Sequence, residues 1–511
     1  MILDDTPERL GPLASPVSAA VSELTELNAV SRAWSADHTL WRDDPTEVAD
    51  RLGWLTVVPD MVTGLDALRR IASRVAAGVD HVLVMGMGGS SLFPEVLAQG
   101  VAPGAGPALH VLDTTDPAAI ARLAADLPPE RTLHVAASKS GSTLETRSHL
   151  AWAWERHPDP ARFAVITDPG SELGALARER AFAAVWENRP DIGGRYSALS
   201  LFGLVPGVLA GADVPGLLTS ASAITERLRT APTANPAARL AAIMAAGVRH
   251  GRDKLTVVVP EEHLAFGLWL EQLLAESTGK DGTGIVPVVG EPVGSPDVYG
   301  DDRVFVSLGA NDGLPALAAA GHPVAVLPFE GEVADLGGQV LLWELATALA
   351  GALLGIQPFD QPDVAAAKAA TETVLEEGRP DLPTTSLDAL LDQVEHGDYL
   401  AIQAFVDPGS PAVAQIEAAR VALRDRLKVA TTVGLGPRFL HSTGQLHKGG
   451  PPTGVFLQVV GDDPVYVPIP GAPYGFSTLK NAQADGDLVT LADRKRRAGR
   501  VPLAELLDAG A

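Results

Sequence analysis

Cysteine is absent from the 511-residue sequence. A chain without thiols forms no disulfide bonds, has no thiolate nucleophile and cannot bind a metal through cysteine. Basic residues are scarce as well, because 39 Lys and Arg stand against 63 Asp and Glu and leave a formal charge of −24. Such an acidic surface argues against broad binding of nucleic acid and against adhesion to anionic membranes, although a few local cations suffice to bind a small anion.

Long apolar runs and targeting signals are also lacking. Residues 1–16 have neither the basic start nor the apolar core of a secretory signal peptide. The longest apolar stretch, Leu341 to Ile356, is interrupted by Glu344 and is short for a membrane span. Together with the missing cysteines, these features predict a soluble, cytoplasmic protein with neither a membrane nor a nucleic-acid partner.

The composition that remains is globular, with 46% hydrophobic and 20% charged residues, which excludes a mainly disordered chain. At about 100–200 residues per domain, the length predicts two to four domains. Residues 1–75 are expected to form amphipathic helices. Apolar runs then alternate with helix-like segments, and they lie at 81–91, 108–116, 131–143 and 162–171. This alternation predicts a parallel sheet with helices on both faces.

The same alternation restarts after an alanine-rich helical connector. Further apolar runs predict a second α/β domain, and they lie at 253–262, 282–291, 302–310 and 323–331. Helices are expected at 335–354 and 363–377, and short strands at 455–460 and 465–470. The predicted fold class is α/β, with two doubly wound parallel sheets. The predicted segments are a helical stretch at 1–75, a first α/β domain at 76–212, a connector at 213–252, a second α/β domain at 253–384 and an α+β extension at 385–511.

Ligands of open parallel sheets bind at the carboxyl ends of the strands. Function is therefore expected near 86–91, 113–116, 138–146 and 167–171. The most informative of these stretches reads SKSGSTLET, begins at Ser138 and is expected to open a helix. Hydroxyls and free backbone N–H groups at a helix N-terminus form an anion site, most naturally for phosphate. A capping box explains one hydroxyl and Glu145, but not four hydroxyls and a lysine within six residues.

The sequence GMGGSS, from Gly86 to Ser91, follows the first predicted strand. It resembles a dinucleotide-binding fingerprint but lacks the last glycine, which counts against a nicotinamide dehydrogenase. Its glycines either let the backbone approach a ligand shared with the 138–143 loop or form a tight structural turn.

Two charged residues at expected helix ends are candidates for carbon-acid chemistry. Arg195, in a Gly-Gly-Arg turn before an apolar helix, is suited to an oxyanion such as phosphate or an enediolate. Glu276 ends an apolar helix that starts near Leu264, where the helix dipole disfavours a carboxylate. Partial burial would raise its pKa and suit a general base. The alternatives are a solvated arginine in a surface turn and a solvated glutamate in a last helical turn.

Two further segments carry polar side chains without a decisive pattern. Lys368 follows Gln361 by seven residues on one face of an expected helix, although most helical lysines are solvated. The stretch LHSTGQLHKGG places His441 and His447 six residues apart, and the sequence shows no third residue that would complete a zinc site with them. A contact with phosphate or sugar, or a loop packed on the active site, fits this stretch better.

The motifs GMGGSS, SKSGSTLET, GGRYS, ESTGKDG and FDQPDVAAAK occur in this order between about residues 80 and 370, and together they resemble the glucose-6-phosphate isomerase family. The stretch LHSTGQLHKGGP resembles the form of this isomerase found alone or fused to transaldolase, and no transaldolase portion is evident. The resemblance implies two sugar-isomerase (SIS) domains and the reversible isomerisation of glucose 6-phosphate and fructose 6-phosphate through a cis-enediolate. It also implies a homodimer, a sugar phosphate as substrate, no cofactor and no metal.

The resemblance assigns roles to individual residues. Glu276 is expected to move the proton between C1 and C2, and Arg195 to stabilise the enediolate. Glu145 matches a pocket glutamate of the family, and Lys368 matches a lysine of ring opening and phosphate contact. The residues expected to bind the substrate are Gly89, Ser90, Ser138, Ser140, Thr143 and Gln361.

One family feature is missing from this chain. These isomerases carry a histidine for ring opening in a G-x-x-x-Q-H segment of the second domain, shared between subunits, and the comparable region here has no Gln-His pair. Ring opening is therefore left to Lys368, His441 or His447. The alternative functions are a phosphosugar-binding regulator without activity and an isomerase of another sugar phosphate. The presence of a base, Glu276, favours catalysis, because binding alone needs none.

Overall fold

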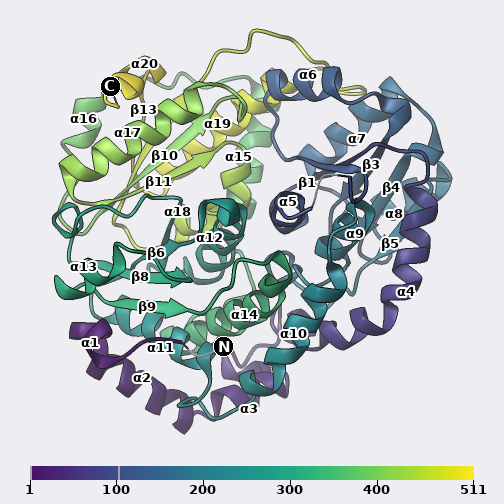
Figure 1. The fold of residues 1–511 in the computed structure, drawn as a ribbon. Coiled ribbons are helices and arrows are strands. Elements are labelled where there is room, and N and C mark those ends of the chain that lie inside the picture. The colour runs from purple at the N-terminus through teal and green to yellow at the C-terminus, as the bar shows by residue number, and fades with distance from the viewer. Residues whose placement is uncertain (1–2, 102–103, 511) are drawn as a thin grey trace.

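Three parallel sheets form the framework of the protein (Figure 1). The computed structural model describes residues 3–101 and 104–510. In the first sheet the strand order is β2-β1-β3-β4-β5, and the strands are β1 (His81–Gly86), β2 (Ala108–Leu112), β3 (Thr132–Ala137), β4 (Phe163–Thr167) and β5 (Ala184–Glu187). The first four strands confirm the predicted apolar runs. The sequence did not indicate β5, which is a four-residue strand at the sheet edge with Trp186 buried and its other three residues partly or fully exposed.

Helices cover both faces of the first sheet, and they are α4 (Val57–Val75), α5 (Leu92–Gln99), α6 (Pro117–Asp126), α7 (Leu144–Arg156), α8 (Glu172–Glu179) and α9 (Leu201–Ala210). Alternate residues of β1 enter different cores. Val82 and Val84 pack with residues of α4 and α9, whereas Leu83 and Met85 pack with residues of α6, α7 and α8. Burial on both faces explains why this strand is apolar throughout.

The second sheet has the strand order β7-β6-β8-β9, and its strands are β6 (Lys254–Val258), β7 (Val286–Val289), β8 (Arg303–Leu308) and β9 (Val324–Leu327). These strands confirm the second predicted alternation. The associated helices are α12 (Leu264–Thr278), α13 (Leu314–Ala319) and α14 (Leu336–Leu354). Glu276 therefore lies in the last turn of α12, as the sequence indicated.

The N-terminal stretch and the connector are helical, as predicted. Their helices are α1 (Pro7–Leu10), α2 (Ala14–Glu26), α3 (Ala29–Trp34), α10 (Val214–Leu228) and α11 (Pro236–Arg249). Both connector helices pack against α14, and α2 packs against α11 along the lower edge of Figure 1. Together these helices form a large apolar core between the first two sheets.

The apolar stretch around Glu344 belongs to α14, which confirms the helix expected at 335–354. Among the described residues, one segment, Val333–Leu354, is long and apolar enough by composition to cross a membrane, but 94% of its window is buried inside the structure. Burial of this extent is what a core helix of a globular protein requires. The helix is apolar on all sides because other helices cover it.

The C-terminal segment forms a third parallel sheet rather than the expected α+β extension. Its order is β11-β10-β12-β13, with strands β10 (Tyr399–Phe405), β11 (Ala430–Leu435), β12 (Gly454–Val460) and β13 (Arg497–Arg500). The helices of this segment are α15 (Val364–Glu377), α16 (Leu387–Leu391), α17 (Ala412–Leu427), α18 (Gly444–Gly449), α19 (Phe476–Asp493) and α20 (Leu503–Asp508). The predicted strand at 465–470 is wrong, since Pro468 forms only a single bridge and prolines cannot donate to a ladder.

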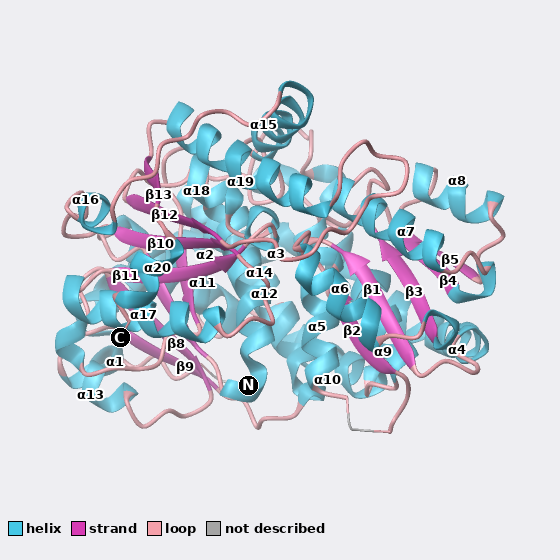
Figure 2. Cartoon of the chain, turned by 90° about the horizontal axis from the view of Figure 1, so that it is seen from above, coloured by secondary structure: helices cyan, strands magenta, loops and turns pink. Residues whose placement is uncertain are grey.

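The third sheet directs its carboxyl end towards the first domain. Asp407, just after β10, forms an ion pair with Arg122 of α6, and the segment after β11 reaches α7 through His441. Figure 2 shows α19 running between the first and third sheets. α15, which the sequence assigned to the second domain, packs along α19.

Candidate active site

A cavity of about 500 Å³ lies where the first domain, α12 and the segment after β11 meet. It opens at the carboxyl ends of β1 and β3, which is the point in the order β2-β1-β3 where the chain reverses direction across the sheet. The predicted residues that line it are Gly89, Ser90, Ser138, Ser140, Thr143, Arg195, Glu276, Gln361, Lys368 and His441. Residues 113–116, expected to contribute, do not line it, because β2 lies at the sheet edge beyond β1.

The loop from Ser138 to Thr143 forms the N-terminal approach to α7. The Ser138 Oγ lies 2.9 Å from the Thr143 Oγ1, and the Gly141 backbone N–H donates to Ser138 at 3.1 Å. The Ser142 N–H donates to the Ser140 hydroxyl at 3.2 Å. These bonds curl the loop around the start of the helix, where backbone N–H groups favour an anion.

Lys139 has another role in the same loop. Its ammonium pairs with Asp168 and donates to the Pro190 carbonyl at 2.8 Å. The lysine therefore links the loop to the segment after β4 through an ion pair, and its positive charge is not left unpaired. Arg51 lines the cavity and brings a positive charge that the sequence did not reveal, because it lies in the helical N-terminal stretch outside any motif.

The glycines of the 86–91 loop serve close packing. A Cβ on Gly89 would collide with the backbone carbonyl of Gly194, and a Cβ on Gly88 would lie 2.7 Å from the Gln272 Nε2. Gly88 also has φ +53°, in the left-handed region that favours glycine. Glycine is required at these positions because the Gly194 turn and α12 leave no room for a side chain. The glycines are therefore explained without a bound dinucleotide.

Arg195 and Glu276 form a buried pair in the cavity wall. The Arg195 Nε lies 3.5 Å from the Glu276 Oε2, and each residue is 5% exposed. The Arg195 Nη2 donates to the carbonyls of Phe359 at 3.1 Å and Asp360 at 2.9 Å. Within the described residues, the buried Nη1 has no hydrogen-bond partner. Both solvated alternatives for these side chains are therefore wrong.

Burial controls the proton affinity of the carboxylate. Loss of hydration raises the pKa of Glu276, and the nearby charges of Arg195, His441 and Lys280 offset part of that increase. Gln272, one helical turn earlier, donates to the Glu276 Oε2 at 3.2 Å and to the His441 carbonyl at 2.7 Å. The sequence analysis did not single out Gln272, although its i, i+4 spacing from Glu276 on an apolar helix is the pattern that places the two side chains together.

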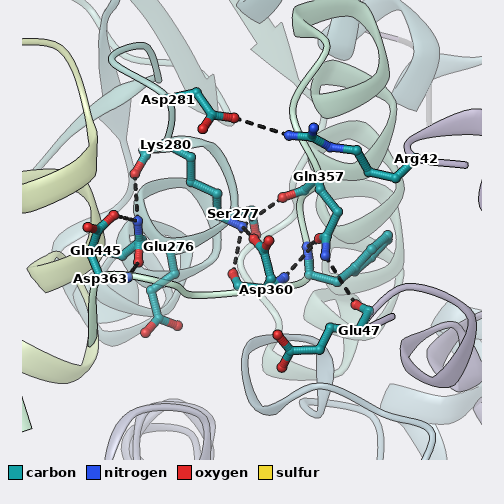
Figure 3. A network of polar contacts seen from close by, with 12 residues as sticks. Arg42, Glu47, Glu276, Ser277, Lys280, Asp281, Gln357, Asp360, Asp363 and Gln445 are labelled. Atoms are coloured by element: carbon teal, nitrogen blue, oxygen red, sulfur yellow. Dashed lines mark hydrogen bonds and ion pairs between the residues drawn. The ribbon is translucent and has the colours of Figure 1, made fainter. Parts of the chain in front are cut away.

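A polar network behind the pair holds the segment that binds Arg195. The Lys280 Nζ donates to the Gln357 carbonyl at 2.7 Å and to both the carbonyl and the carboxylate of Asp360 at 2.6 Å. Burial lowers the pKa of Lys280 to about 7. Figure 3 shows this network with the Glu276 carboxylate pointing away from it. The two carbonyls that receive Arg195 are thus fixed by a group outside the cavity.

The C-terminal segment is joined to the same region. Gln445 of α18 accepts from the Asp363 N–H at 3.0 Å and donates to the Asp363 carboxylate at 2.8 Å, as Figure 3 shows. Asp363 precedes α15, and this helix carries Lys368. Gln361 and Lys368 are exposed at the mouth of the cavity.

Glu145 and His441 form a second charged contact. The His441 Nε2 lies 2.8 Å from the Glu145 Oε1, although Glu145 itself does not line the cavity. Burial alone would raise the pKa of Glu145, but the charge and hydrogen bond of His441 and the Glu145 backbone N–H outweigh it and lower the pKa to about 2. Glu145 is therefore joined to the cavity through His441 and does not itself line it.

The two histidines of the C-terminal stretch are separated by the fold. His447 is buried against Phe439 and Phe456, and its Nδ1 lies 3.2 Å from the Gln403 Nε2. Burial lowers the pKa of His447 well below its usual value. Unlike His441, it does not line the cavity.

Comparisons with known proteins identify relatives of this chain. The phosphoglucose isomerase family profile matches residues 38–286. The chain is 31% identical over 429 residues to a glucose-6-phosphate isomerase of Rubrobacter xylanophilus, covering 70% of this chain and 94% of that protein. It is also 31% identical over 386 residues to the glucose-6-phosphate isomerase of Thermus thermophilus, covering 64% of this chain and 90% of that protein.

Solved structures show the same fold. A hypothetical protein of Thermus thermophilus aligns with a TM-score of 0.63 and 26% identity, over 73% of this chain and 99% of its own. A glucose-6-phosphate isomerase of Chlamydia trachomatis aligns with a TM-score of 0.58 and 18% identity, over 73% of this chain and 88% of its own. With a sequence relative matched over nearly its whole length and this fold, the chain belongs to the phosphoglucose isomerase family.

Proposed function

We propose that this isomerase of glucose 6-phosphate and fructose 6-phosphate transfers one proton between C2 and C1 through a cis-enediolate, with Glu276 as the base. In the aldose-to-ketose direction, Glu276 takes the proton from C2 and returns it to C1, while a second proton passes from O2 to O1. The observation that carries the proposal is a buried carboxylate of raised pKa in the wall of a cavity whose other side is an anion-binding loop.

Arg195 is the group that stabilises the enediolate. Its Nη2 is held by two backbone carbonyls, whereas its buried Nη1 has no partner among the described residues. Arg195 lines the same cavity as the base. A fixed cationic donor next to developing negative charge needs no reorganisation during the reaction.

The substrate phosphate binds to the loop that opens α7. Ser138, Ser140 and Thr143 offer hydroxyls there, and Gln361 and Lys368 border the same cavity. Phosphate bound at a distance from the reacting carbons supplies binding energy that orients C1 and C2 against Glu276. Gly89 and Ser90 line the path between the phosphate loop and the base.

His441 opens the sugar ring. An ionised Glu145 accepts a hydrogen bond from the His441 Nε2–H, which leaves Nδ1 for the substrate. In glucose 6-phosphate, ring opening breaks the C1–O5 bond, O5 gains a proton, and O1 loses one as the carbonyl forms. In fructose 6-phosphate the bond that breaks is C2–O5, and O2 loses the proton. His441 moves these protons, with Lys368 at the cavity mouth as the other cationic group. His447 takes no part, because it lies in the core of the C-terminal segment.

The expected setting follows from the family resemblance and from the composition. The enzyme works as a homodimer in the cytoplasm on a phosphosugar and uses neither nucleic acid nor a membrane as partner. A binding-only regulator would need the phosphate loop but no buried base, so the Glu276–Arg195 pair favours catalysis.

The test is the conversion of fructose 6-phosphate to glucose 6-phosphate by the purified chain, with Glu276→Gln measured alongside. The variant keeps the shape of the side chain and removes its basicity. We expect strong activity in the parent and a loss of at least about 1,000-fold in the variant. A Glu276→Gln enzyme with near-parental turnover would show that another group carries the proton.

A further inference from the structure

A buried glutamine of the C-terminal segment that does not line the cavity contacts the Glu145–His441 pair. Gln483 lies in α19 and is 4% exposed. Its Nε2 donates to the Glu145 Oε1 at 2.7 Å, and its Oε1 accepts from the Thr115 hydroxyl at 2.7 Å. Thr115 is fully buried. The four side chains therefore form one chain of hydrogen bonds from Thr115 through Gln483 and Glu145 to His441.

The donors and acceptors of this chain have one consistent arrangement. An ionised carboxylate only accepts hydrogen bonds, so the Gln483 amide must turn its NH₂ towards Glu145. Its carbonyl then faces Thr115, whose hydroxyl donates. The same carboxylate oxygen accepts from the His441 Nε2, which fixes the tautomer protonated at that nitrogen.

The helix that carries Gln483 is anchored on both sides of it. Lys480 is fully buried and pairs with Asp116 of the first domain at 3.0 Å, and also with Asp463 after β12. Asp485 pairs with Arg500 at 2.8 Å. The glutamine therefore meets Glu145 from a fixed backbone, which is the condition for holding an acid–base pair within the narrow geometry that proton transfer needs.

We propose that Gln483, oriented by Thr115, is a positioning residue for ring opening, which fixes Glu145 and through it the orientation and tautomer of His441. This inference rests on the proposed role of His441. It gives the third sheet a function in the reaction, because α19 and the segment after β11 bring Gln483 and His441 to the same carboxylate oxygen of Glu145.

The test compares a substrate that closes a ring with one that cannot. Both rings of the natural substrates close through O5, so 5-deoxyfructose 6-phosphate exists only in the open form and needs no ring opening. Exchange of the C1 proton with deuterated water, followed by NMR, reports the Glu276 step for both substrates. In Gln483→Met, which keeps the length of the side chain and removes its donor, we expect fructose 6-phosphate turnover to fall at least about tenfold. Exchange on the 5-deoxy substrate is expected to stay within about twofold of the parent.

A matched control is available in the same segment. Gln403→Met removes a buried glutamine whose partner is His447, and it is expected to leave both substrates unaffected. Thr115→Val serves as a second variant, because it removes only the hydroxyl that orients the Gln483 amide, and we expect the same selective loss at smaller size. Unlike Thr115→Val, Thr115→Ser keeps a hydroxyl at this position, and it is expected to keep the parental rate.

Three outcomes would overturn the inference. Equal losses on the two substrates would assign Gln483 a general structural role, and unchanged turnover of fructose 6-phosphate in both Gln483→Met and Thr115→Val would remove its role altogether. A selective loss in Gln403→Met in place of Gln483→Met would point to His447. A different result would contradict the proposed function itself. In that case Glu276→Gln would retain exchange on the 5-deoxy substrate, and the residue at position 483 would not change this result.

Discussion

The guanidinium Nε of Arg195 lies 3.5 Å from the Glu276 Oε2, with both side chains buried in the wall of one cavity. The hydrogen bonds of Arg195 go to backbone carbonyls, so its charge is positioned by the main chain and not by the carboxylate alone. Buried ion pairs contribute little net stability, because desolvation offsets their attraction. The pair is therefore better explained by chemistry that needs a base and a cation side by side.

Replacing Arg195 with lysine tests its role at the enediolate. A lysine keeps the charge but cannot hold two carbonyls and present a further donor in a fixed plane. We expect kcat for fructose 6-phosphate to fall about 100- to 1,000-fold with a small change in KM, as for the loss of one oxyanion donor. Steady-state kinetics give the separate effects on kcat and on KM. Arg497→Lys, on β13 and paired with Asp398, is the control. A rise in KM without a fall in kcat for Arg195→Lys would assign Arg195 to substrate binding.

The pH dependence of the reaction should report the environment of Glu276. A general base works when ionised, so activity falls as the pH drops through its pKa. Burial raises this pKa and Arg195 lowers it. Removing the positive charge in Arg195→Gln therefore raises the pKa further, and we expect the acid limb of log kcat/KM to move to higher pH. The residual activity is followed by deuterium exchange at C1, and a limb that stays in place or moves down would contradict the assignment.

The two histidines of the C-terminal segment should differ in effect. His441→Ala removes a side chain that lines the cavity, so we expect turnover of fructose 6-phosphate to fall by about 100-fold while exchange on 5-deoxyfructose 6-phosphate is kept. His447→Ala is expected to lower the unfolding temperature, because it empties a packed site, with little change in the rate of the folded enzyme. Unchanged rates in both variants would leave ring opening to Lys368.

The phosphate loop can be tested without the chemical step. Thr143→Val removes a hydroxyl that lies 2.9 Å from Ser138 at the start of α7. Hydrogen bonds to a charged group contribute about 1.5–3 kcal/mol, so we expect kcat/KM to fall about 10- to 100-fold. Competitive inhibition by inorganic phosphate should weaken by a similar factor. Ser222→Ala, on α10, is the control; unaltered phosphate inhibition in Thr143→Val would place the anion elsewhere.

Glu344 should make the stability of the enzyme depend on pH. It is 1% exposed in α14, and neither carboxylate oxygen has a partner among the described residues. Burial raises the pKa of Glu344 well above its usual value. The folded state thus keeps a proton that the unfolded state releases, and stability falls as the pH rises above the unfolded pKa, by about 1.4 kcal/mol per pH unit until the folded pKa is reached.

Glu344→Gln removes this titration. We expect its urea midpoint to exceed that of the parent at pH 8 by more than at pH 5. The exposed Glu226, on α10, supplies the control, since Glu226→Gln should change the midpoint equally at both pH values. A gap between Glu344→Gln and the parent that narrows with rising pH would show that Glu344 is ionised in the fold.

The phosphate loop and the base differ in how far the sequence could define them. The hydroxyls of 138–143 are contiguous and follow a strand, so their gathering at a helix start was predictable from local pattern alone. Lys139 belonged to the same pattern, yet it pairs with Asp168 from the loop after β4. Its partner comes from another strand, and no local pattern distinguishes a free lysine from a paired one.

The sequence by itself determined the alternation of strands and helices, because apolar spacing records which residues of one segment face a core. It also determined the gathering of hydroxyls in the loop 138–143 at the start of α7, because these residues are neighbours along the chain. Only the tertiary structure decided that Glu276 is buried beside Arg195, that His441 and not His447 reaches the cavity, and that the C-terminal segment is a third parallel sheet. Desolvation, ion pairing and strand pairing all depend on groups brought together from distant parts of the chain, and such contacts exist only after folding.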